Sequence, residues 1–268
     1  MNDLCGKAVL VTGGTAGIGL ATALRFAEAG AACTLTYRFG TADEDEVRAA
    51  FAARGAPPPL IVQADASRDD DTDALLEEMR ARHDAVEVFV SNVSGALVTH
   101  SFEDYDRRGL MKSIGVSAWP MVAYTRKIRA VFGRYPRYVI GMSSTGPDHF
   151  SVGYDFVAAS KSVMETLCRY MSYRLFDRDC RVNVIRSRSI RTEAFESTFG
   201  KDFYDFAMRL SREEHFLVPD DVAKVAFALA NGSMDAVSGQ VITVDKGTTF
   251  FDDLMRLWHE RDALGLSR

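Results

Sequence analysis

Residues 8–19 read Ala-Val-Leu-Val-Thr-Gly-Gly-Thr-Ala-Gly-Ile-Gly, a buried-strand pattern followed at once by a glycine-rich turn. A helical pattern then runs from Leu20 to Ala29 and ends at Gly30. Glycine permits a tight turn and lets the backbone approach a phosphate, whose charge the amino end of the next helix stabilises. This order predicts a dinucleotide-binding unit in preference to a purely structural turn. Its candidate cofactor-binding residues are Gly13, Thr15, Gly17, Ile18 and Gly19.

The same alternation of strand and helix continues along the chain. Strands are expected at 8–12, 34–37, 60–63, 86–90, 138–142, 181–185 and 240–244. Helices are expected at 20–29, 43–53, 72–82, 108–131, 157–175 and 220–230, with a kink or break near Pro120. Such alternation is typical of a parallel sheet covered on both faces. We therefore predict α/β architecture: a single doubly wound Rossmann-type domain over residues 1–268, with a seven-stranded parallel sheet.

Composition narrows the class of partner. Hydrophobic residues make up 47% and charged residues 26% of the 268, which is typical of a globular protein. A net charge of −5 disfavours nucleic acid or an anionic membrane surface as a partner. We find no secretory signal, no apolar run of the roughly 20 residues that span a bilayer, and no metal-ligand spacing among the cysteines and histidines. A soluble, cytoplasmic protein without a metal site is expected.

The end of the second predicted strand bears on cofactor choice. Many dinucleotide-binding folds place an acidic residue there, on the ribose hydroxyls. This chain has Tyr37-Arg38, and the next acidic residue along the chain is Asp43. An arginine suits a 2′-phosphate, which a carboxylate would repel. The sequence therefore favours NADPH over NADH, the alternative being that Arg38 is a solvated side chain at a strand end.

Several short motifs together resemble the short-chain dehydrogenase/reductase family. They are the glycine turn, Asp65-Ala66, the segment 90–95 (Val-Ser-Asn-Val-Ser-Gly) and Ser143-Ser144. The resemblance extends from Gly6 to about Gly247. It implies that Asp65 meets the adenine, that Asn92 lines the cofactor cleft, and that the protein forms a homotetramer or homodimer.

The catalytic region departs from the usual pattern of that family. The usual Tyr-x-x-x-Lys requires a tyrosine four residues before Lys161, where this chain has Val157. Tyr154 precedes Lys161 by seven residues instead. This wider spacing resembles a divergent branch, the enoyl-acyl carrier protein reductases, which reduce the carbon–carbon double bond of an acyl thioester.

A second segment resembles the same branch. Residues 181–185 lead into Ser-Ile-Arg-Thr at 189–192, similar to the nicotinamide-side segment of those reductases. The resemblance places Ile190 and Thr192 against the cofactor. Arg186 and Arg188 stand where the branch has small residues; they either grip a phosphate of an acyl carrier or lie solvated at the surface.

The resemblance implies a role for each catalytic candidate. Tyr154 would donate a hydrogen bond to the enolate oxygen, and Lys161 would hold the nicotinamide ribose. Ser144 would be a second polar group of the site, or a plain serine at the strand end. The expected substrate is an acyl thioester on acyl carrier protein or coenzyme A, from fatty-acid or specialised polyketide biosynthesis. A carbonyl or ketoacyl reductase is one alternative, and a non-catalytic NADP(H)-binding sensor is another.

An aromatic stretch at about 193–216 does not follow the rhythm of the sheet. It comes after the sixth predicted strand, on the side where such folds bind ligands. The stretch is either a lid over an apolar substrate or a segment that packs on the body or on a neighbouring subunit. The candidate lid residues are Phe195, Phe199, Phe203 and Phe206.

Overall fold

Seven parallel strands form one sheet in a computed structural model that describes residues 4–38, 43–95, 98–188, 190, 192, 195–196, 200 and 202–266. The strand order is β3-β2-β1-β4-β5-β6-β7, and every neighbouring pair is parallel. This confirms the predicted fold class. The strands are β1 (Ala8–Val11), β2 (Ala32–Tyr37), β3 (Leu60–Gln63), β4 (Val86–Ser91), β5 (Tyr138–Ser144), β6 (Arg181–Ser187) and β7 (Val241–Val244).

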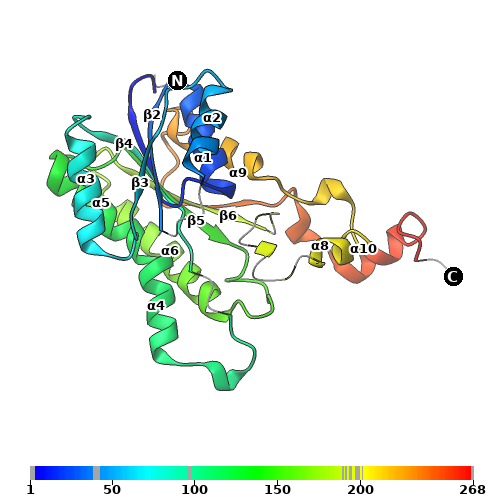
Figure 1. Cartoon of the computed structure of the whole chain (residues 1–268). Helices are drawn as coiled ribbons and strands as arrows, with labels where there is room; N and C mark the ends of the chain where they lie inside the picture. The colour runs from blue at the N-terminus through cyan, green and yellow to red at the C-terminus, as the bar shows by residue number, and fades with distance from the viewer. Residues whose placement is uncertain are drawn as a thin grey trace.

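Helices cover both faces of the sheet (Figure 1). They are α1 (Gly17–Glu28), α2 (Glu44–Ala52), α3 (Asp69–Arg80), α4 (Arg107–Ser117), α5 (Trp119–Phe132), α6 (Asp155–Arg174), α8 (Phe203–Ala207), α9 (Pro219–Ala230) and α10 (Asp253–Glu260). Short 3₁₀ helices lie at Phe102–Asp104, Glu213–His215 and Thr248–Phe250. The helix expected at 108–131 is broken at Ala118, and Pro120 lies in the first turn of α5, where its missing N–H costs no hydrogen bond.

Each face of the sheet has its own apolar core. Phe26 of α1 and Leu229 of α9 are buried in one core, and Met79 of α3, Tyr124 of α5 and Met164 of α6 are buried in the other. β1 is buried along its whole length, as expected for a central parallel strand covered on both faces.

The topology reverses between two central strands. From β1 the chain continues to β2 on one side, whereas β4 pairs with β1 on the other side. In open α/β sheets, ligands bind outside the carboxyl ends of the strands at such a switch point. The segments after β1, β4, β5 and β6 therefore define where to look for the site.

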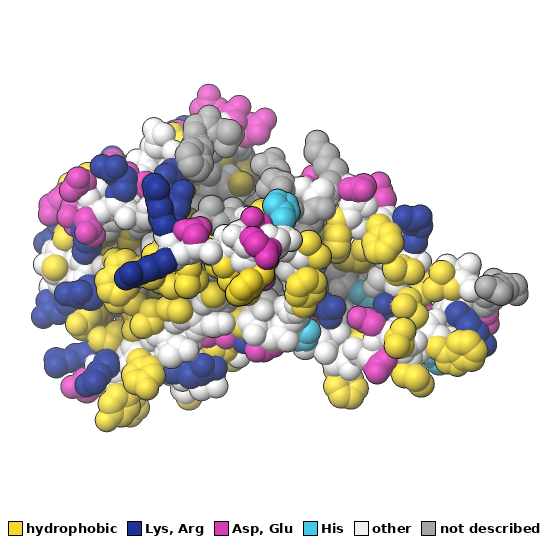
Figure 2. All heavy atoms as spheres, turned by 90° about the horizontal axis from the view of Figure 1, so that it is seen from below, with side chains coloured by type: hydrophobic (Ala, Val, Ile, Leu, Met, Phe, Trp, Pro, Cys, Tyr) yellow, Lys and Arg dark blue, Asp and Glu magenta, His cyan; other side chains and the backbone are white. Residues whose placement is uncertain are grey.

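Figure 2 shows the molecule from below, with hydrophobic side chains spread over the body and over the arm at the C-terminal end.

Within the described ranges, no helix has both the length and the apolar character to cross a membrane. The same ranges contain no group of three or more His, Cys, Asp or Glu side chains arranged to hold a metal ion.

Candidate active site

The turn after β1 is shaped by its glycines. Gly13 has a φ of +62°, which favours glycine. A Cβ on Gly19 would lie 2.1 Å from the carbonyl oxygen of Gly13, so no side chain fits there. α1 begins at Gly17 with no side-chain cap and no acidic residue in its first turn. This amino end therefore suits a bound phosphate. Thr15 lies half-buried in the turn, and Ile18 packs against the core.

Asn92 fixes this turn from the end of β4. Its backbone N–H donates to Oγ1 of Thr12 at 3.1 Å. Its side-chain Nδ2 donates to the carbonyl oxygens of Thr12 at 3.1 Å and Gly13 at 3.0 Å. Asn92 thus lies at the edge of the expected cofactor cleft, where it holds the backbone of the glycine turn.

The segment after β6 returns to the same place. A Cβ on Gly17 would lie 3.3 Å from Cγ2 of Thr192, so Thr192 lies against the amino end of α1. Oγ1 of Thr192 accepts a hydrogen bond from the N–H of Phe195 at 3.2 Å. Ile190 is buried and forms a parallel bridge with Leu217. The fold therefore brings Thr192, distant in sequence, against the glycine turn, with Ile190 buried two residues before it.

Arg38 and Asp65 form an ion pair at the carboxyl ends of β2 and β3. Nε of Arg38 lies 2.9 Å from Oδ2 of Asp65. Burial by itself raises the pKa of Asp65, but two hydrogen bonds from Ser67 and the Arg38 charge hold that pKa below its usual value. A hollow of about 430 Å³ opens beside the pair. It is lined by Arg38, Val62, Gln63, Asp65, Asp70, Asp71, Ala74, Leu75 and Glu78, among which Arg38 is the one cationic side chain.

Tyr154 and Ser144 meet where β5 leads into α6. Ser144 is the last residue of β5, and Tyr154 immediately precedes α6. The two side chains share a hydrogen bond. A Cβ on Gly146 would lie 2.8 Å from the Tyr154 ring, so only glycine lets the turn pack on that ring. Burial raises the pKa of Tyr154 and the Ser144 hydrogen bond opposes the shift, so the hydroxyl keeps its proton at neutral pH.

Lys161 lies nearly two turns further along α6. Seven residues at about 3.6 per turn make almost two full turns, so Lys161 lies at nearly the same angle around the helix axis as the position where α6 begins. Lys161 is 3% exposed, and its Nζ donates to the carbonyl oxygen of Met142 at 2.8 Å. Burial lowers the pKa of Lys161 to about 8, against an opposing effect of Glu165. Val157, at the usual tyrosine position, is 2% exposed and belongs to the core.

Two charged groups near these residues were not expected from the sequence. The Arg186 side chain is only 14% exposed and pairs with Glu165 and Asp148, so the alternative of a solvated Arg186 is wrong. Asp155, the first residue of α6, accepts hydrogen bonds from Thr99 and from the hydroxyl of Tyr105. In the sequence, the only sign of the Arg186 group was an arginine at a position where the enoyl reductases have a small residue.

The aromatic stretch forms a cluster of its own. The rings of Phe195, Phe203 and Tyr204 lie 5.2–5.7 Å from one another, centre to centre, and the ring of Phe216 lies 5.7 Å from that of Tyr204. Phe206 is 53% exposed, with the Arg209 guanidinium 5.5 Å from its ring centre. Phe199 lies outside the described residues.

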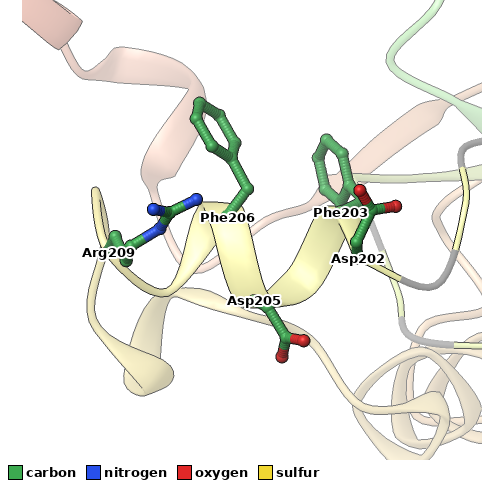
Figure 3. A pocket seen from close by; sticks show the side chains of 5 residues that line it. All are labelled: Asp202, Phe203, Asp205, Phe206 and Arg209. Carbon is green, nitrogen blue, oxygen red and sulfur yellow. The ribbon is translucent and has the colours of Figure 1, made fainter.

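A hollow of about 550 Å³ lies on α8, lined by Asp202, Phe203, Asp205, Phe206 and Arg209. In Figure 3 the rings of Phe203 and Phe206 point to the same side and Asp205 points away from them. None of the expected catalytic residues lines this hollow. Of the lid candidates, the structure therefore brings Phe195 and Phe203 together, and Tyr154 does not line the hollow beside them.

Comparison with known proteins gives matches over most of the chain. A family model described as Enoyl-(Acyl carrier protein) reductase matches residues 13–249. The chain is 30% identical over 261 residues to 3β-hydroxysteroid dehydrogenase 1 of Eggerthella lenta, covering 93% of this chain and 96% of that one. It is 25% identical over 256 residues to the enoyl-[acyl-carrier-protein] reductase [NADH] of Aquifex aeolicus, covering 92% and 93%. The crystal structure of an enoyl-[acyl-carrier-protein] reductase (NADH) from Aquifex aeolicus matches with a TM-score of 0.80 at 22% identity, covering 93% and 98%.

Proposed function

Because the chain belongs to the short-chain dehydrogenase/reductase family of NAD(P)H-dependent oxidoreductases, we propose that it reduces the carbon–carbon double bond of an α,β-unsaturated acyl thioester with NADPH. The observation that carries this proposal is the placement of Tyr154. Tyr154 immediately precedes α6, hydrogen-bonds to Ser144 and lies seven residues before the buried Lys161, whereas the usual tyrosine position is filled by the core side chain of Val157.

Tyr154 is the proposed donor to the substrate oxygen. When a hydride adds to the β-carbon, the double-bond electrons move toward the thioester carbonyl and an enolate forms. A preorganised hydroxyl at that oxygen stabilises the developing charge, and a proton then reaches the α-carbon. Ser144, hydrogen-bonded to Tyr154, orients this hydroxyl and is the second polar group of the site.

Lys161 is the proposed partner of the cofactor ribose. Its ammonium lies buried close to the end of β5, where a positive charge favours an anionic transition state nearby. A pKa of about 8 leaves it mostly protonated at neutral pH.

The glycine turn fits a dinucleotide. Gly19 has no side chain, so the turn can pack closely against it. The amino end of α1 carries no side-chain cap and is therefore open to the pyrophosphate. Bound NADPH would supply the hydride. The residues that would hold it are Gly13, Thr15, Gly17, Ile18, Gly19, Arg38, Asp65, Asn92, Lys161, Ile190 and Thr192. Arg38 supports NADPH over NADH because its guanidinium, at the end of β2, suits a 2′-phosphate.

The proposed substrate is carried on acyl carrier protein or coenzyme A. In this proposal residues 1–268 act as a single catalytic domain, and the aromatic stretch at 193–216 encloses the acyl chain. The rings of Phe195 and Phe203 support it because they provide apolar surface just after the segment of Thr192. The acyl chain that the enzyme accepts would decide whether it acts in fatty-acid or in polyketide biosynthesis.

A carbonyl reductase is the second candidate. The relative with 30% identity is named a hydroxysteroid dehydrogenase, and chloroplast relatives of 24% and 25% identity in Arabidopsis thaliana are named for NADPH-dependent aldehyde reduction. Tyr154 would then protonate an alkoxide where the first proposal has it stabilise an enolate. Both candidates use the same residues and differ in the bond reduced.

A matched pair of substrates separates the two candidates. Crotonyl-CoA and acetoacetyl-CoA have the same acyl length and carrier, but one offers a C=C bond and the other a ketone. We expect the purified protein to oxidise NADPH with crotonyl-CoA faster than with acetoacetyl-CoA, followed by absorbance of NADPH. The reverse preference would establish the carbonyl reductase, and tight NADPH binding without turnover of either would favour a non-catalytic sensor.

A further inference from the structure

Arg186 joins three parts of the molecule through its guanidinium. It lies at the carboxyl end of β6. Its Nε donates to Oε1 of Glu165 at 3.0 Å, and its Nη2 donates to Oε2 of the same carboxylate at 2.5 Å. Its Nη1 pairs with the carboxylate of Asp148, in the connection between β5 and α6. One side chain therefore ties β6 to α6 and to that connection.

The Glu165 end of this arrangement is buried. Glu165 is 4% exposed, and its Oε1 also accepts a hydrogen bond from the hydroxyl of Ser143 at 2.7 Å. A bidentate arginine–carboxylate pair is among the stronger and geometrically more specific contacts in proteins. The guanidinium is therefore fixed in place, and its third donor has a defined direction toward Asp148.

The connection that Asp148 belongs to has few apolar anchors. Residues 145–153 link Ser144 to Tyr154, and their two large apolar side chains, Phe150 and Val152, are exposed. Hydrogen bonds from the N–H groups of Asp148 and His149 to the carbonyl oxygen of Thr145 shape the turn locally. They do not join it to β6 or to the body of α6, which the Arg186–Asp148 pair does.

We propose that Arg186 is a positioning residue that holds the 145–153 connection, and with it Ser144 and Tyr154, in the geometry needed for reduction. The inference rests on the proposed function for its catalytic readout only. Arg186 itself need not touch substrate or cofactor. Its effect passes through Asp148 at one end and through Glu165 and Ser143, the neighbour of Ser144, at the other.

Arg186 also binds the carboxylate that lies nearest along α6 to Lys161. Glu165 lies one turn after Lys161 on α6, close enough to raise its pKa. With both carboxylate oxygens bound to Arg186, Nζ of Lys161 donates to the carbonyl oxygen of Met142. Removal of Arg186 would take from the buried Glu165 carboxylate its bidentate partner, which also makes an Arg186 variant prone to unfold.

The test therefore uses Asp148→Asn, which leaves the buried pair intact, because the Asp148 side chain is mostly exposed. We expect hydrogen–deuterium exchange in 145–153 to increase, and kcat to fall roughly 10- to 100-fold as expected for a displaced catalytic group. The dissociation constant for NADPH should stay unchanged. Asp148→Glu keeps the charge and should recover most of kcat.

A matched control lies at the start of β5, the strand whose other end leads into residues 145–153. Arg137 pairs with Asp235 at 2.8 Å beside the start of β5. Arg137→Met should lower the melting temperature without changing kcat or the exchange of 145–153. An equal fall in kcat for Arg137→Met would reduce the Asp148 effect to general destabilisation and overturn the proposal.

Two further outcomes would also overturn it: unchanged exchange in 145–153 for Asp148→Asn, or increased exchange with a wild-type kcat. If the wild-type protein turns over neither crotonyl-CoA nor acetoacetyl-CoA, the proposed function fails separately. The exchange contrast between Asp148→Asn and Arg137→Met then decides whether Arg186 holds the connection.

Discussion

The hydroxyl of Tyr154 is the one atom on which the proposed chemistry depends most. Loss of a single preorganised donor to an oxyanion costs about 2.7–4 kcal/mol, or roughly 10²–10³ in kcat. We expect Tyr154→Phe to lower kcat by that factor and to leave the dissociation constant for NADPH nearly unchanged. Tyr170→Phe, an exposed tyrosine on the same helix, is the control. If Tyr154→Phe retained most of kcat, Ser144 or a bound water would become the next candidate donor.

The charge of Lys161 should be visible in the pH profile. Its pKa lies at about 8, below the ordinary lysine value, so its proton is lost as pH rises through about 8. Since kcat/KM reports groups of the free enzyme, we expect kcat/KM for NADPH to fall above that pH. Lys161→Met should lack this alkaline fall and have a low, flat profile. A wild-type profile that stays level up to the ordinary lysine pKa would contradict a role for the ammonium.

Arg38 should decide between the two nicotinamide cofactors. Charge-assisted contacts of a guanidinium with phosphate contribute roughly 1.5–3 kcal/mol, about ten- to a hundredfold in affinity. We expect Arg38→Ala to weaken NADPH by that factor and to affect NADH little, measured by fluorescence titration. Arg68→Ala, which removes a nearby exposed arginine, is the control. Equal losses for both cofactors would mean that Arg38 mainly supports Asp65, its ion-pair partner.

Single residues differ in how far their roles can be predicted from sequence. The glycine turn and the spacing of Tyr154 and Lys161 are local, since a few adjacent positions determine their geometry. Arg186 is different, because its partners Glu165 and Asp148 lie 21 and 38 residues away along the chain. No local pattern encodes such a contact. The pairing of Arg38 with Asp65 was likewise not predictable, although each residue was a candidate by itself.

At the scale of elements, the sequence predicted the order of strands and helices but not every boundary. α1 begins at Gly17, ahead of the expected Leu20, because glycines carry no apolar side chain to start the periodicity. α3 begins at Asp69, ahead of Thr72, with three aspartates in its first turn. Such acidic residues stabilise a helix amino end while giving no apolar signal. α10 is a short helix that was not expected.

The aromatic stretch gives a prediction that separates packing from substrate contact. Phe203 lies within the ring cluster, whereas Phe206 is half exposed on the same helix. If the stretch encloses an acyl chain, Phe206→Ala should raise KM more for long thioesters than for short ones, by up to about 0.8 kcal/mol per buried methylene. Its melting temperature should match wild type. Phe203→Ala should lower the melting temperature, and a chain-length-independent KM in both variants would restrict the stretch to packing.

At the scale of the whole molecule, the fold explains why distant motifs form one site. Parallel strands direct their carboxyl ends to one edge, so the segments after β1, β4, β5 and β6 converge. The convergence of Thr192 with Gly17 follows from this topology, which alternating strands and helices predict. Side-chain pairing across the edge depends on exact packing, so the sequence alone left it open.

The surface of the whole molecule leads to a prediction about assembly. Tyr170 and Tyr173 are exposed three residues apart on α6, on neighbouring parts of one helix face, and the exposed Phe176 follows just beyond the end of the helix. Exposed apolar surface of this kind commonly marks an interface, and identical chains most often pair through a two-fold axis. We expect sedimentation to give a homodimer or homotetramer.

Tyr173→Glu should shift the protein toward smaller species, because a carboxylate buried without a partner is costly. Lys224→Gln, which also changes the net charge by −1 but on the exposed side of α9, should leave the mass unchanged. A wild-type monomer would show that these aromatic side chains remain in water.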